Sequence, residues 1–532
     1  MTTTPSRVDP GSLEKALAEL VGVLGKDRVM LESEDTEREY RDPFQPASWD
    51  YYLPSAIVFP HSTEEVQEIV RIANRHTIPI WTHSTGKNNG YGGAAPGYGG
   101  AITISMRQMN KVLEINEELA YVVVEPGVTW RSLYETLTAG GHRLMVTNPD
   151  LGWGSVIGNT LEHGVSYGPT GSDYGACCGM EVVTPDGDVL RTGMGSMTDN
   201  PTFHTYKRSF GPSIDTLFMQ SNLGIVTKMG FWLIPAPEYF NCVWTRCWKD
   251  DDLIALVDNT RRLRLERTIE GVPGMFNTVL LASAFARRSD FYTGEGSIPD
   301  PVIDQMGKQL EIGRWMFRTG LYGHEAQTDM QYERIKAAME QIPGADVWRT
   351  KVPFDEIANL ENPGELVVGG VPNLEALHMI GWYNENDGGH LDFSPVIPLV
   401  GKEVYKVHSL LRNTLETEAG LDYQVGSCAV NPRSTIHVGL ITFDASDEEV
   451  SRRCYGTLKK MIGTCAEAGY GEYRSHVDHM DEIASHYDFN DHAYRRYIEK
   501  IKDAVDPNGI LSPGKQGIWP ERLRDQRGES FI

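Results

Sequence analysis

A long run of small residues follows a strand–helix–strand pattern early in the chain. It reads HSTGKNNGYGGAAPGYGG over residues 83–100. Residues without bulky side chains let the backbone approach a ligand, and successive N–H groups in such a loop can surround an anion. Because the run comes directly after a βαβ-like unit, it favours a pyrophosphate-binding loop, with a purely structural loop as the alternative.

The unit before this loop, residues 56–82, has the pattern of two strands joined by a helix. AIVFP is a short apolar run, and TIPIW resumes an extended pattern. Ser62 can cap the helix, with Glu65 three residues later completing a capping box. One face of the predicted helix then carries Val66, Ile69, Val70 and Ala73.

Two common nucleotide-binding motifs do not occur in the sequence. Residues 150–158 read DLGWGSVIG, in which the last glycine comes one residue too late for GxGxxG. The chain also lacks the GxxxxGK motif that is followed by Ser or Thr. These differences disfavour a plain Rossmann dehydrogenase and an NTPase.

The pattern of expected strands and helices changes twice along the rest of the chain. Strand signals continue to about residue 235, with a hairpin expected around Pro185-Asp186-Gly187. The middle of the chain alternates helical patterns, at 301–317 and 329–342, with the strand-like STIHVGLITF. A last helix stops at Asp506-Pro507. At about 150 residues per domain, the 532 residues predict roughly three segments, which we place at 1–238, 239–469 and 470–532.

Charge and cysteine usage narrow the class of protein. The formal net charge of -24 disfavours nucleic acid and anionic membrane surfaces as partners. The N-terminus has no basic and apolar secretory signal, and no apolar run is long enough to span a bilayer, so cytoplasm is the expected location. The seven cysteines are scattered and odd in number, which predicts buried or inert thiols rather than a disulfide framework.

Several motifs in order resemble one known family. Together with the glycine-rich loop, they make the chain similar to the vanillyl-alcohol oxidase and 4-cresol dehydrogenase family of flavoproteins, and most similar to its eugenol oxidase-like 4-alkylphenol oxidases. The resemblance covers about residues 12–520 and is weakest in 240–370. The motifs are PDLGWGSVIGNTLEHGVSYGP (149–169), MEVVTPDGDVLRTGMG (180–195), QSNLGIVTKMGFWL (220–233), NDGGHLDFSPV (386–396), GYGEYRSH (469–476) and AVDPNGILSPGKQGIW (504–519).

The resemblance implies an α+β fold with two domains. Both ends of the chain, 1–238 and 470–532, form an FAD-binding domain of the vanillyl-alcohol oxidase type, and 239–469 form a cap over the flavin. It implies covalent attachment through His390, which precedes Leu391-Asp392-Phe393-Ser394-Pro395, with Tyr383 as a less favoured tyrosyl link. The implied FAD-binding residues are Ser84, Thr85, Gly86, Lys87, Asn88, Asn89, Gly90, Pro149, Gly154, Ser155, Gly158, Asn159, Thr160, Gly224, Ile225, Val226 and Lys515.

The resemblance also implies a phenol-binding trio of Tyr91, Tyr473 and Arg474. A phenol has a reference pKa near 10, so binding it as phenolate at neutral pH requires a local cation and hydrogen-bond donors. Arg474 supplies the cation and the two tyrosines supply hydroxyl groups. Asp150 matches an acid near flavin N5 in the oxidases, where it stabilises charge and handles a proton.

Two further residues are implied in the substrate pocket. His437 falls where the family has a cap-domain histidine, although Ile436 replaces an adjacent histidine of many relatives. Asp392 stands where many relatives have a small or apolar residue, and the segment 425–434 also departs from them. His476 and His479 have the spacing of two metal ligands, but without a third ligand we predict a solvated polar helix face and no metal site.

The implied reaction is oxidation of a para-substituted phenol. A hydride passes from the benzylic carbon to flavin N5, leaving a para-quinone methide, and dioxygen then reoxidises the flavin and yields hydrogen peroxide. The candidate substrates are 4-alkylphenols, 4-alkylguaiacols, vanillyl alcohol and eugenol-like phenols. A dehydrogenase that passes electrons to another acceptor and a flavin-binding protein without turnover are the alternatives. Relatives form dimers or larger assemblies, so a homodimer or higher homo-oligomer is expected.

Overall fold

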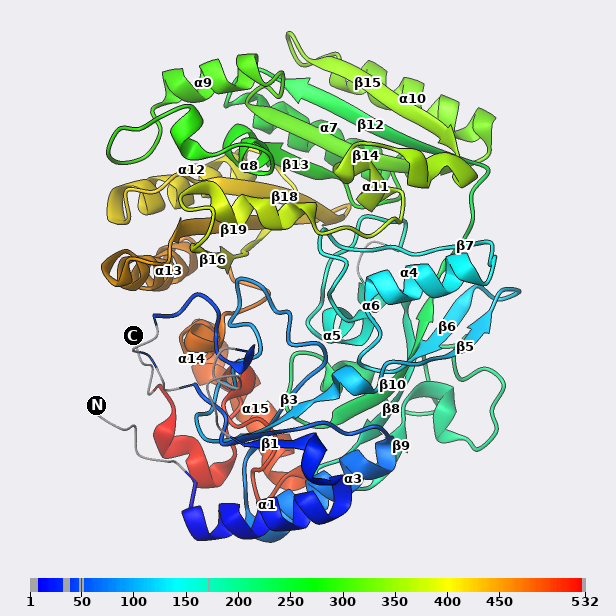
Figure 1. Ribbon diagram of the computed structural model, residues 1–532. Coiled ribbons are helices and arrows are strands. Elements are labelled where there is room, and N and C mark those ends of the chain that lie inside the picture. The colour runs from blue at the N-terminus through cyan, green and yellow to red at the C-terminus, as the bar shows by residue number, and fades with distance from the viewer. Residues whose placement is uncertain (1–7, 32–38, 47–48, 50–51, 171–172, 529–532) are drawn as a thin grey trace.

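The computed structural model describes residues 8–31, 39–46, 49, 52–170 and 173–528. The fold has two halves, shown one above the other in Figure 1. The lower half combines the N-terminal part of the chain, in blue and cyan, with the C-terminal part, in red. The upper half, in green to orange, consists of the middle of the chain, from β12, which begins at Tyr239, to α13, which ends at Glu467.

The first sheet of the lower half contains the predicted βαβ unit. Its strand order is β1 (Val29–Leu31), β2 (Ala56–Val58), β4 (Ile102–Ser105) and β3 (Ile80–His83), with β2, β4 and β3 parallel. Helix α3 (Thr63–His76) joins β2 to β3 and packs on α1 (Pro10–Leu24). Ser62 caps α3, but Glu65 accepts from the N–H of His61, so the predicted capping box is only half formed.

A second, antiparallel sheet completes the lower half. Its strand order is β5 (Val112–Asn116), β6 (Tyr121–Val124), β10 (Ile225–Trp232), β8 (Cys177–Val183) and β9 (Val189–Arg191). The hairpin between β8 and β9 confirms the turn predicted at 185–187. Helices α4 (Trp130–Ala139), α5 (Val156–Leu161) and α6 (Asp173–Ala176) lie beside it, and β7 (Leu144–Met145) pairs with β11 (Ile234–Pro235).

The C-terminal segment packs against the N-terminal part of the chain. It contains α14 (Met480–Ser485) and α15 (Phe489–Val505), and α15 stops before Asp506 as predicted. The ammonium of Lys502 is fully buried, 2.7 Å from Asp506 Oδ2 and 2.7 Å from the carbonyl oxygens of Asn222 and Leu511. This buried cation connects α15 to the loop before β10 and to the chain beside β3.

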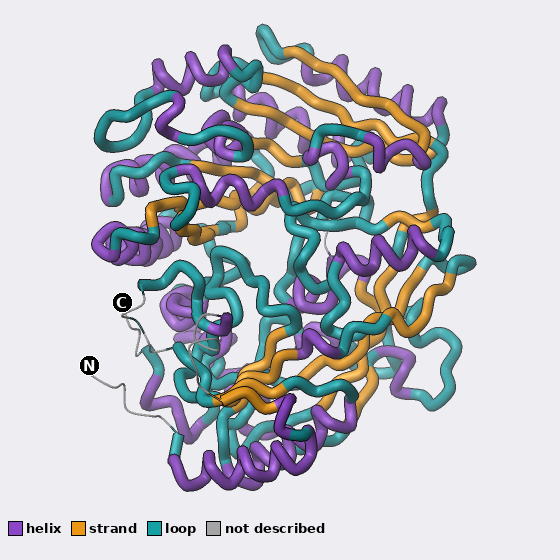
Figure 2. Tube along the Cα trace, in the orientation of Figure 1, coloured by secondary structure: helices purple, strands orange, loops and turns teal. Residues whose placement is uncertain are grey.

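The upper half is a large antiparallel sheet covered by helices on its outer face (Figure 2). The strand order is β15 (Asp346–Pro353), β12 (Tyr239–Cys247), β14 (Trp315–Gly323), β13 (Gly274–Asn277), β18 (Gln424–Asn431), β19 (Ser434–Asp444) and β16 (Gly388–Phe393), with β17 (Val396–Pro398) also on β19. The helices that share a core with its outer face are α7 (Asp252–Leu265), α10 (Glu325–Met339), α12 (Gly401–Glu418) and α13 (Glu448–Glu467).

The inner face of this sheet faces the lower half of the molecule. Its apolar residues form a separate cluster that includes Trp244, Phe276 and Cys428, together with Tyr167 from the lower half. Three shorter helices complete the upper half: α8 (Thr278–Ser283), α9 (Asp300–Gln309) and α11 (Pro363–Val368). Side chains alternate between the two faces along each strand. A strand residue of the upper half therefore belongs either to the helix-covered core or to the interface between the halves.

One helix is shorter than its sequence pattern predicts. The helical pattern of residues 301–317 ends at Gln309, and Trp315 already begins β14. Gly313, with φ of 63°, turns the chain between the helix and the strand, a conformation that favours glycine. The apolar residues after Gly313 alternate between the two faces of the sheet.

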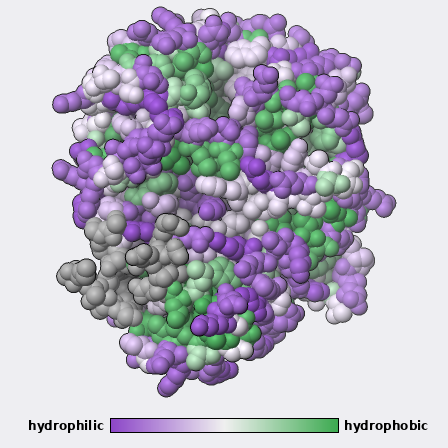
Figure 3. Space-filling view, viewed as in Figure 1, coloured by the Kyte–Doolittle hydropathy of each residue, from purple (hydrophilic) through white to green (hydrophobic). Residues whose placement is uncertain are grey.

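The polarity of the surface and the burial of the cysteines are typical of a globular protein. Hydrophilic side chains cover most of the face shown in Figure 3, and apolar ones form separate patches. All seven cysteines are buried and unpaired, and burial raises the pKa of their thiols. Among the described residues, no helix has both the length and the apolar character needed to cross a bilayer.

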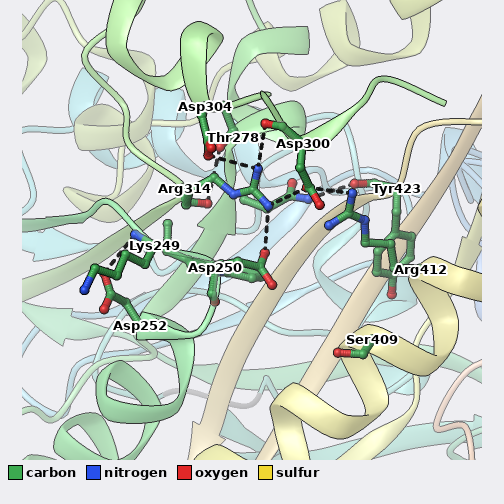
Figure 4. A network of polar contacts seen from close by, with 12 residues as sticks. Lys249, Asp250, Asp252, Thr278, Asp300, Asp304, Arg314, Ser409, Arg412 and Tyr423 are labelled. Carbon is green, nitrogen blue, oxygen red and sulfur yellow. Dashed lines mark hydrogen bonds and ion pairs between the residues drawn. The ribbon is translucent and has the colours of Figure 1, made fainter. Parts of the chain in front are cut away.

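A polar network stabilises one edge of the upper half (Figure 4). The buried guanidinium of Arg314 lies 3.1 Å from Asp250, 2.8 Å from Asp300 and 3.3 Å from Asp304, and Arg412 also contacts Asp300 at 2.9 Å. These contacts connect β14, α9, α12 and the turn before α7.

We expect Arg314→Met to lower the free energy of unfolding by about 2 kcal/mol, because several charge-assisted hydrogen bonds are lost. The cost stays moderate since Asp300 and Asp304 remain more than half exposed to water. Thermal unfolding at equal flavin content measures it. Arg334→Met, which removes an exposed pair with Glu266, is the matched control and should cost less than about 0.5 kcal/mol. Equal effects of the two substitutions would contradict the role of the network.

Candidate active site

A cavity in the lower half collects most of the residues predicted to bind the cofactor. It lies between the loop after β3, helix α5, the start of β10 and the C-terminal segment. Predicted residues in its wall are Ser84, Thr85, Gly86, Lys87, Asn88, Gly154, Ser155, Gly158, Asn159, Gly224, Ile225, Val226 and Lys515. The wall does not include Asn89, Gly90, Pro149, Thr160 or His390.

The polar groups of this cavity are arranged to receive a ligand. Both ring nitrogens of His83, Oδ1 of Asn222 and Nε of Arg474 are buried without a hydrogen-bond partner among the described residues. Such groups are costly unless a ligand or water satisfies them. Burial and the nearby Arg107 lower the pKa of His83 to about 4, so the imidazole is neutral. A Cβ at Gly158 would overlap Ser84, so the walls approach closely where glycine permits it.

Positive charge lies at one side of the cavity. Lys515 Nζ is 2.6 Å from Glu162 Oε1, and Arg474 is a further electrostatic neighbour of this carboxylate. Burial favours the protonated form of Glu162, but Lys515 and Arg474 outweigh it and hold the pKa of the carboxyl below its usual value. The cavity wall thus combines close backbone approach with cations, as a pyrophosphate requires.

The three residues of the predicted phenol-binding trio come together at the edge of this cavity. The guanidinium of Arg474 lies over the ring of Tyr91, 4.5 Å from its centroid, and Tyr473 precedes Arg474 in the chain. The Tyr91 hydroxyl is 2.8 Å from Ser394 Oγ, and Arg474 donates a hydrogen bond to Asn88. Tyr91 and Tyr473, although far apart in sequence, are therefore both neighbours of one half-buried cation.

The protonation of this cluster is set by burial. Burial raises the pKa of Tyr91 well above its usual value, and Asp392 and Tyr473 raise it further. Burial also raises the pKa of Tyr473, against the opposing effect of Arg474. For Arg474, burial lowers the pKa, but Tyr473, Tyr91 and Glu162 outweigh it and leave the pKa raised. The cluster consequently offers two phenolic O–H groups and a permanent cation.

His390 lies on the inner face of β16, beside the glycine-rich loop. Its Nδ1 is 3.0 Å from Nδ2 of Asn89, and its Nε2 is 3.0 Å from Oδ1 of Asp392. All three approach Gly90, where φ is 77° and a Cβ would overlap the Asp392 carboxylate. Asp392 is therefore a partner of His390, in addition to being an electrostatic neighbour of Tyr91.

Tyr383 is far from this arrangement. Its hydroxyl accepts a hydrogen bond of 2.8 Å from the backbone N–H of Asp422, and Arg288 lies 5.5 Å from its ring centroid. Burial and Asp422 raise the pKa of Tyr383 well above its usual value. The structure thus places Tyr383 in the upper half, outside the cavity wall, and offers no support for a tyrosyl link.

Asp150 belongs to a second group of residues. The hydroxyl of Tyr167 donates a hydrogen bond of 2.6 Å to Asp150 Oδ2, and Nη2 of Arg318 is 3.7 Å from Asp150 Oδ1. Cys428 connects this group to the trio, since its thiol is an electrostatic neighbour of Asp150 and Arg318 and also of Tyr473.

The predicted histidines outside β16 lie elsewhere. His437 faces the helix-covered side of the sheet, where Nδ1 is 2.5 Å from Ser427 Oγ and the ring contacts His408 of α12. It therefore lies apart from the other residues predicted to bind the substrate. The neighbouring Ile436 takes the inner face. The prediction of a solvated helix face at His476 and His479 is wrong: both are 1% exposed, and His476 Nε2 is 2.7 Å from Asp42 Oδ2.

Comparisons with known proteins agree with this geometry. Residues 54–193 match an FAD binding domain, and residues 433–516 match the C-terminal domain of FAD linked oxidases. The flavoprotein subunit of 4-cresol dehydrogenase (hydroxylating) from Pseudomonas putida is 34% identical over 519 residues, or 97% of each chain. The chain belongs to the vanillyl-alcohol oxidase and 4-cresol dehydrogenase family of flavoproteins.

Two solved structures of family members have the same fold over the whole chain. A 4-ethylphenol oxidase from Gulosibacter chungangensis, in complex with isoeugenol, is 38% identical with a TM-score of 0.92, covering 98% of this chain and 100% of the other. A p-cresol methylhydroxylase with substrate bound is 33% identical with a TM-score of 0.91, covering 97% and 98%. The family resemblance and the α+β flavoprotein fold predicted from the sequence are confirmed.

As a member of this family the chain is an FAD-dependent oxidoreductase, and its cavity fits FAD. Buried unpartnered groups, close glycine contacts and cations are all present in one wall. Sequence reasoning missed Ser394, Tyr167 and Arg318. Arg318 is the only one with a detectable signal, since it is a cation within the otherwise apolar and small stretch WMFRTGLYG.

Proposed function

We propose that the chain oxidises para-substituted phenols at the benzylic carbon, with 4-alkylphenols as the core substrates and 4-alkylguaiacols, vanillyl alcohol and eugenol-like phenols as further candidates. The observation that carries the proposal is the cluster of buried Tyr91 with half-buried Tyr473 and Arg474 at the edge of the FAD cavity. The names of the two solved relatives, a 4-ethylphenol oxidase and a p-cresol methylhydroxylase, support a phenol with a para alkyl group.

The side chains of the cluster have separate roles in this reaction. Arg474 stabilises the phenolate form of the substrate, because a buried cation lowers the pKa of a nearby phenol. Tyr91 and Tyr473 keep their protons and donate hydrogen bonds to the phenolate oxygen. The charge on that oxygen makes the para benzylic position a hydride donor, and the bound FAD supplies the acceptor. The protein thus contributes position and electrostatics.

We further propose that dioxygen is the final electron acceptor and that hydrogen peroxide is released. Asp150, which matches an acid of the oxidases, supports this choice. Its carboxylate accepts a hydrogen bond from Tyr167 and lies beside the cation of Arg318, which holds it in one orientation. The alternative is a dehydrogenase that passes electrons to another acceptor. Cytoplasmic location and a homodimer stay predictions.

Anaerobic addition of 4-ethylphenol to the purified holoenzyme tests the proposed function. We expect the visible flavin absorbance to bleach, and admission of air to restore it with release of hydrogen peroxide. Bleaching that persists in air but is reversed by a dye or a cytochrome would favour the dehydrogenase. Flavin that no para-substituted phenol bleaches would contradict phenol oxidation altogether.

We also propose that His390 carries FAD covalently and that Asp392 assists. In the apoprotein Nε2–H of His390 donates a hydrogen bond of 3.0 Å to Asp392 Oδ1, which leaves the lone pair on Nδ1 and fixes the orientation of the ring. Both side chains are buried, so water does not compete for this hydrogen bond. A carboxylate here can take up the proton that the imidazole must lose when it forms a bond to carbon.

We expect Asp392→Asn to slow covalent attachment roughly 10²-fold and His390→Ala to abolish it. Apoprotein is mixed with FAD, and the flavin retained by acid-precipitated protein is followed over time. Asp387→Asn, which changes an exposed carboxylate just before β16, is the control and should behave as the wild type. Attachment at the wild-type rate in Asp392→Asn would rule out proton uptake by Asp392.

A further inference from the structure

We propose that Arg318 binds a carboxylate at the end of the para side chain of the substrate, so that the substrates include para-substituted phenols with a carboxylated side chain. The inference rests on the proposed function and specifies the substrate class of the same site. It places the phenolate against Arg474 and the carboxylate against the buried Arg318, one at each end of the molecule.

Strand register places Arg318 on the inner face of the upper sheet, in a row with residues of the site. Arg318 of β14 pairs with Gly274 of β13, Gly274 pairs with Cys428 of β18, and Cys428 pairs with Ile436 of β19. Directly paired residues on neighbouring strands point to the same side of a sheet. Strands are about 4.8 Å apart, so Arg318 is roughly 10 Å from Cys428 along this row.

Cys428 marks where the row meets the phenol-binding trio. Its thiol is an electrostatic neighbour of Tyr473 on one side and of Asp150 and Arg318 on the other. Gly274, between Cys428 and Arg318, has no side chain, and the ring of Phe276 covers it, so a substrate that spans the row passes over this ring. The span of about two strands suits a phenol ring followed by a short para chain.

The guanidinium of Arg318 has two unused hydrogen-bond donors. The residue is 6% exposed, yet neither Nε nor Nη2 has a hydrogen-bond partner among the described residues. These two nitrogens lie along the same edge of the planar guanidinium and form the fork that binds a carboxylate with two parallel hydrogen bonds. Buried donors are rarely left unsatisfied in native proteins, so the fork calls for an acceptor from a ligand.

The surroundings hold the fork in place without satisfying it. The rings of Tyr167, Phe276 and Trp244 lie 4.5, 5.0 and 5.9 Å from the Arg318 Cζ. Asp150 is an ion-pair partner at 3.7 Å, beyond hydrogen-bond distance, and its other oxygen accepts from Tyr167. Asp150 offsets part of the charge of Arg318, so the expected preference for a carboxylate is limited in size.

Arg318 also borders open space. It lines a second cavity, of about 1210 Å³, together with Asp150, Trp244, Phe276 and Met316. Arg246, in the same wall, is the informative comparison. Its Nε donates to Asp346 at 3.0 Å and its Nη1 to the carbonyl of Glu311 at 2.7 Å, so its fork is already used. The two arginines share a cavity and differ in whether their donors are free.

Two substrates of equal chain length test the inference in the holoenzyme. Anaerobic stopped-flow reduction of the flavin by 3-(4-hydroxyphenyl)propanoate and by 4-propylphenol gives a dissociation constant and a limiting rate for each. We expect Arg318→Met to weaken binding of the propanoate roughly 10- to 100-fold and to change binding of 4-propylphenol less than about 3-fold. Arg246→Met should change neither. Arg318→Lys, which keeps the charge but lacks the fork, should weaken the propanoate less than Met does.

Other results overturn the inference. An equal fall in limiting rate for both substrates would mean that Arg318 acts by positioning Asp150. Unchanged binding of the propanoate in Arg318→Met would exclude the contact. If Arg318→Met does not fold, the test uses the wild-type enzyme with two ligands. The inference then requires that the wild type binds the propanoate more tightly than the methyl ester of the propanoate. If 4-propylphenol bleaches the wild-type flavin but the propanoate does not, the carboxylate site alone fails. If neither phenol bleaches it, the proposed function fails as well.

Discussion

Replacing Arg474 with methionine is expected to slow anaerobic reduction of the flavin by 4-ethylphenol about 10³-fold at pH 7. Arg474 is half-buried, lies 4.5 Å from the ring centroid of Tyr91 and has a buried Nε without a partner among the described residues. Removing one preorganised donor from an active site costs about 3–4 kcal/mol in the transition state, and here a charge is lost as well. The physical cause is that the substrate then stays a neutral phenol.

The pH dependence separates this cause from general damage. A phenol in water ionises near pH 10, so reduction of the variant should rise about tenfold per pH unit up to that value, while the wild type changes much less. Stopped-flow absorbance between pH 7 and 10 measures both. Flavin content must be equal, because Arg474 also borders the FAD cavity. Arg474→Lys keeps the charge and should recover part of the rate. A wild-type rate in Arg474→Met would exclude phenolate binding at this position.

Stability is expected to fall steeply in acid, and three buried histidines alone contribute a loss of about 4 kcal/mol per pH unit near pH 5. Burial lowers the pKa of His83 to about 4 and the pKa values of His408 and His479 to about 3. In the unfolded chain each titrates near 6.5, so the unfolded state binds these protons first as the pH falls. Stability is therefore complete above pH 6.5 and is lost as the pH decreases, by about 1.4 kcal/mol per unit for each histidine.

The lower limit of this window follows from the same pKa values. The contribution of His83 stops changing near pH 4, and those of His408 and His479 near pH 3. The contribution of His476 to stability depends on pH in the opposite direction. Burial lowers the pKa of His476, but the bond to Asp42 outweighs burial and raises it. Its contribution is present below pH 6.5 and is lost as the pH rises through the raised value, so it does not offset the acid loss.

Urea unfolding of the holoenzyme between pH 7.5 and 5 measures the slope. His408→Gln should reduce it by about 1.4 kcal/mol per pH unit, since one titrating group is removed. His324→Gln is the control, because the side chain of His324 is almost fully exposed and pairs with Glu238 at the surface, and it should leave the slope unchanged. A slope that is the same in the wild type and in His408→Gln would show that His408 is not neutral in the folded state.

Much of the lower half could be predicted from local pattern. The βαβ unit, the hairpin at 185–187 and the stop after Val505 depend on neighbouring residues, whose spacing and turn chemistry act over a few positions. The loop after β3 lines the cavity, and it could be predicted as a ligand loop for the same reason, because a run of small residues is itself the property that lets backbone approach a ligand. The helix predicted over 301–317 was too long. Apolar spacing near its end fits either a helix or a strand, and only Gly313 marks the change from one to the other.

Side chains on the upper sheet show where local pattern is insufficient. Alternation along β19 separates His437 from Ile436, but which of the two faces the site depends on which side of the sheet α12 covers. A shift of one residue exchanges the two faces, so a motif match cannot decide it. Asp392 is similar, because its contact with His390 follows from two residues sharing one face of β16.

The sequence by itself determined the flavoprotein family, and through that resemblance it predicted the cofactor loop and the trio of Tyr91, Tyr473 and Arg474, because these residues lie in recognisable local motifs. The tertiary structure alone decided which distant groups are neighbours. His476 and Asp42 bond across 434 positions, and Arg318, Asp150 and Cys428 meet from three separate parts of the chain. Such pairings depend on strand register and on the packing of the two halves, which no local spacing records.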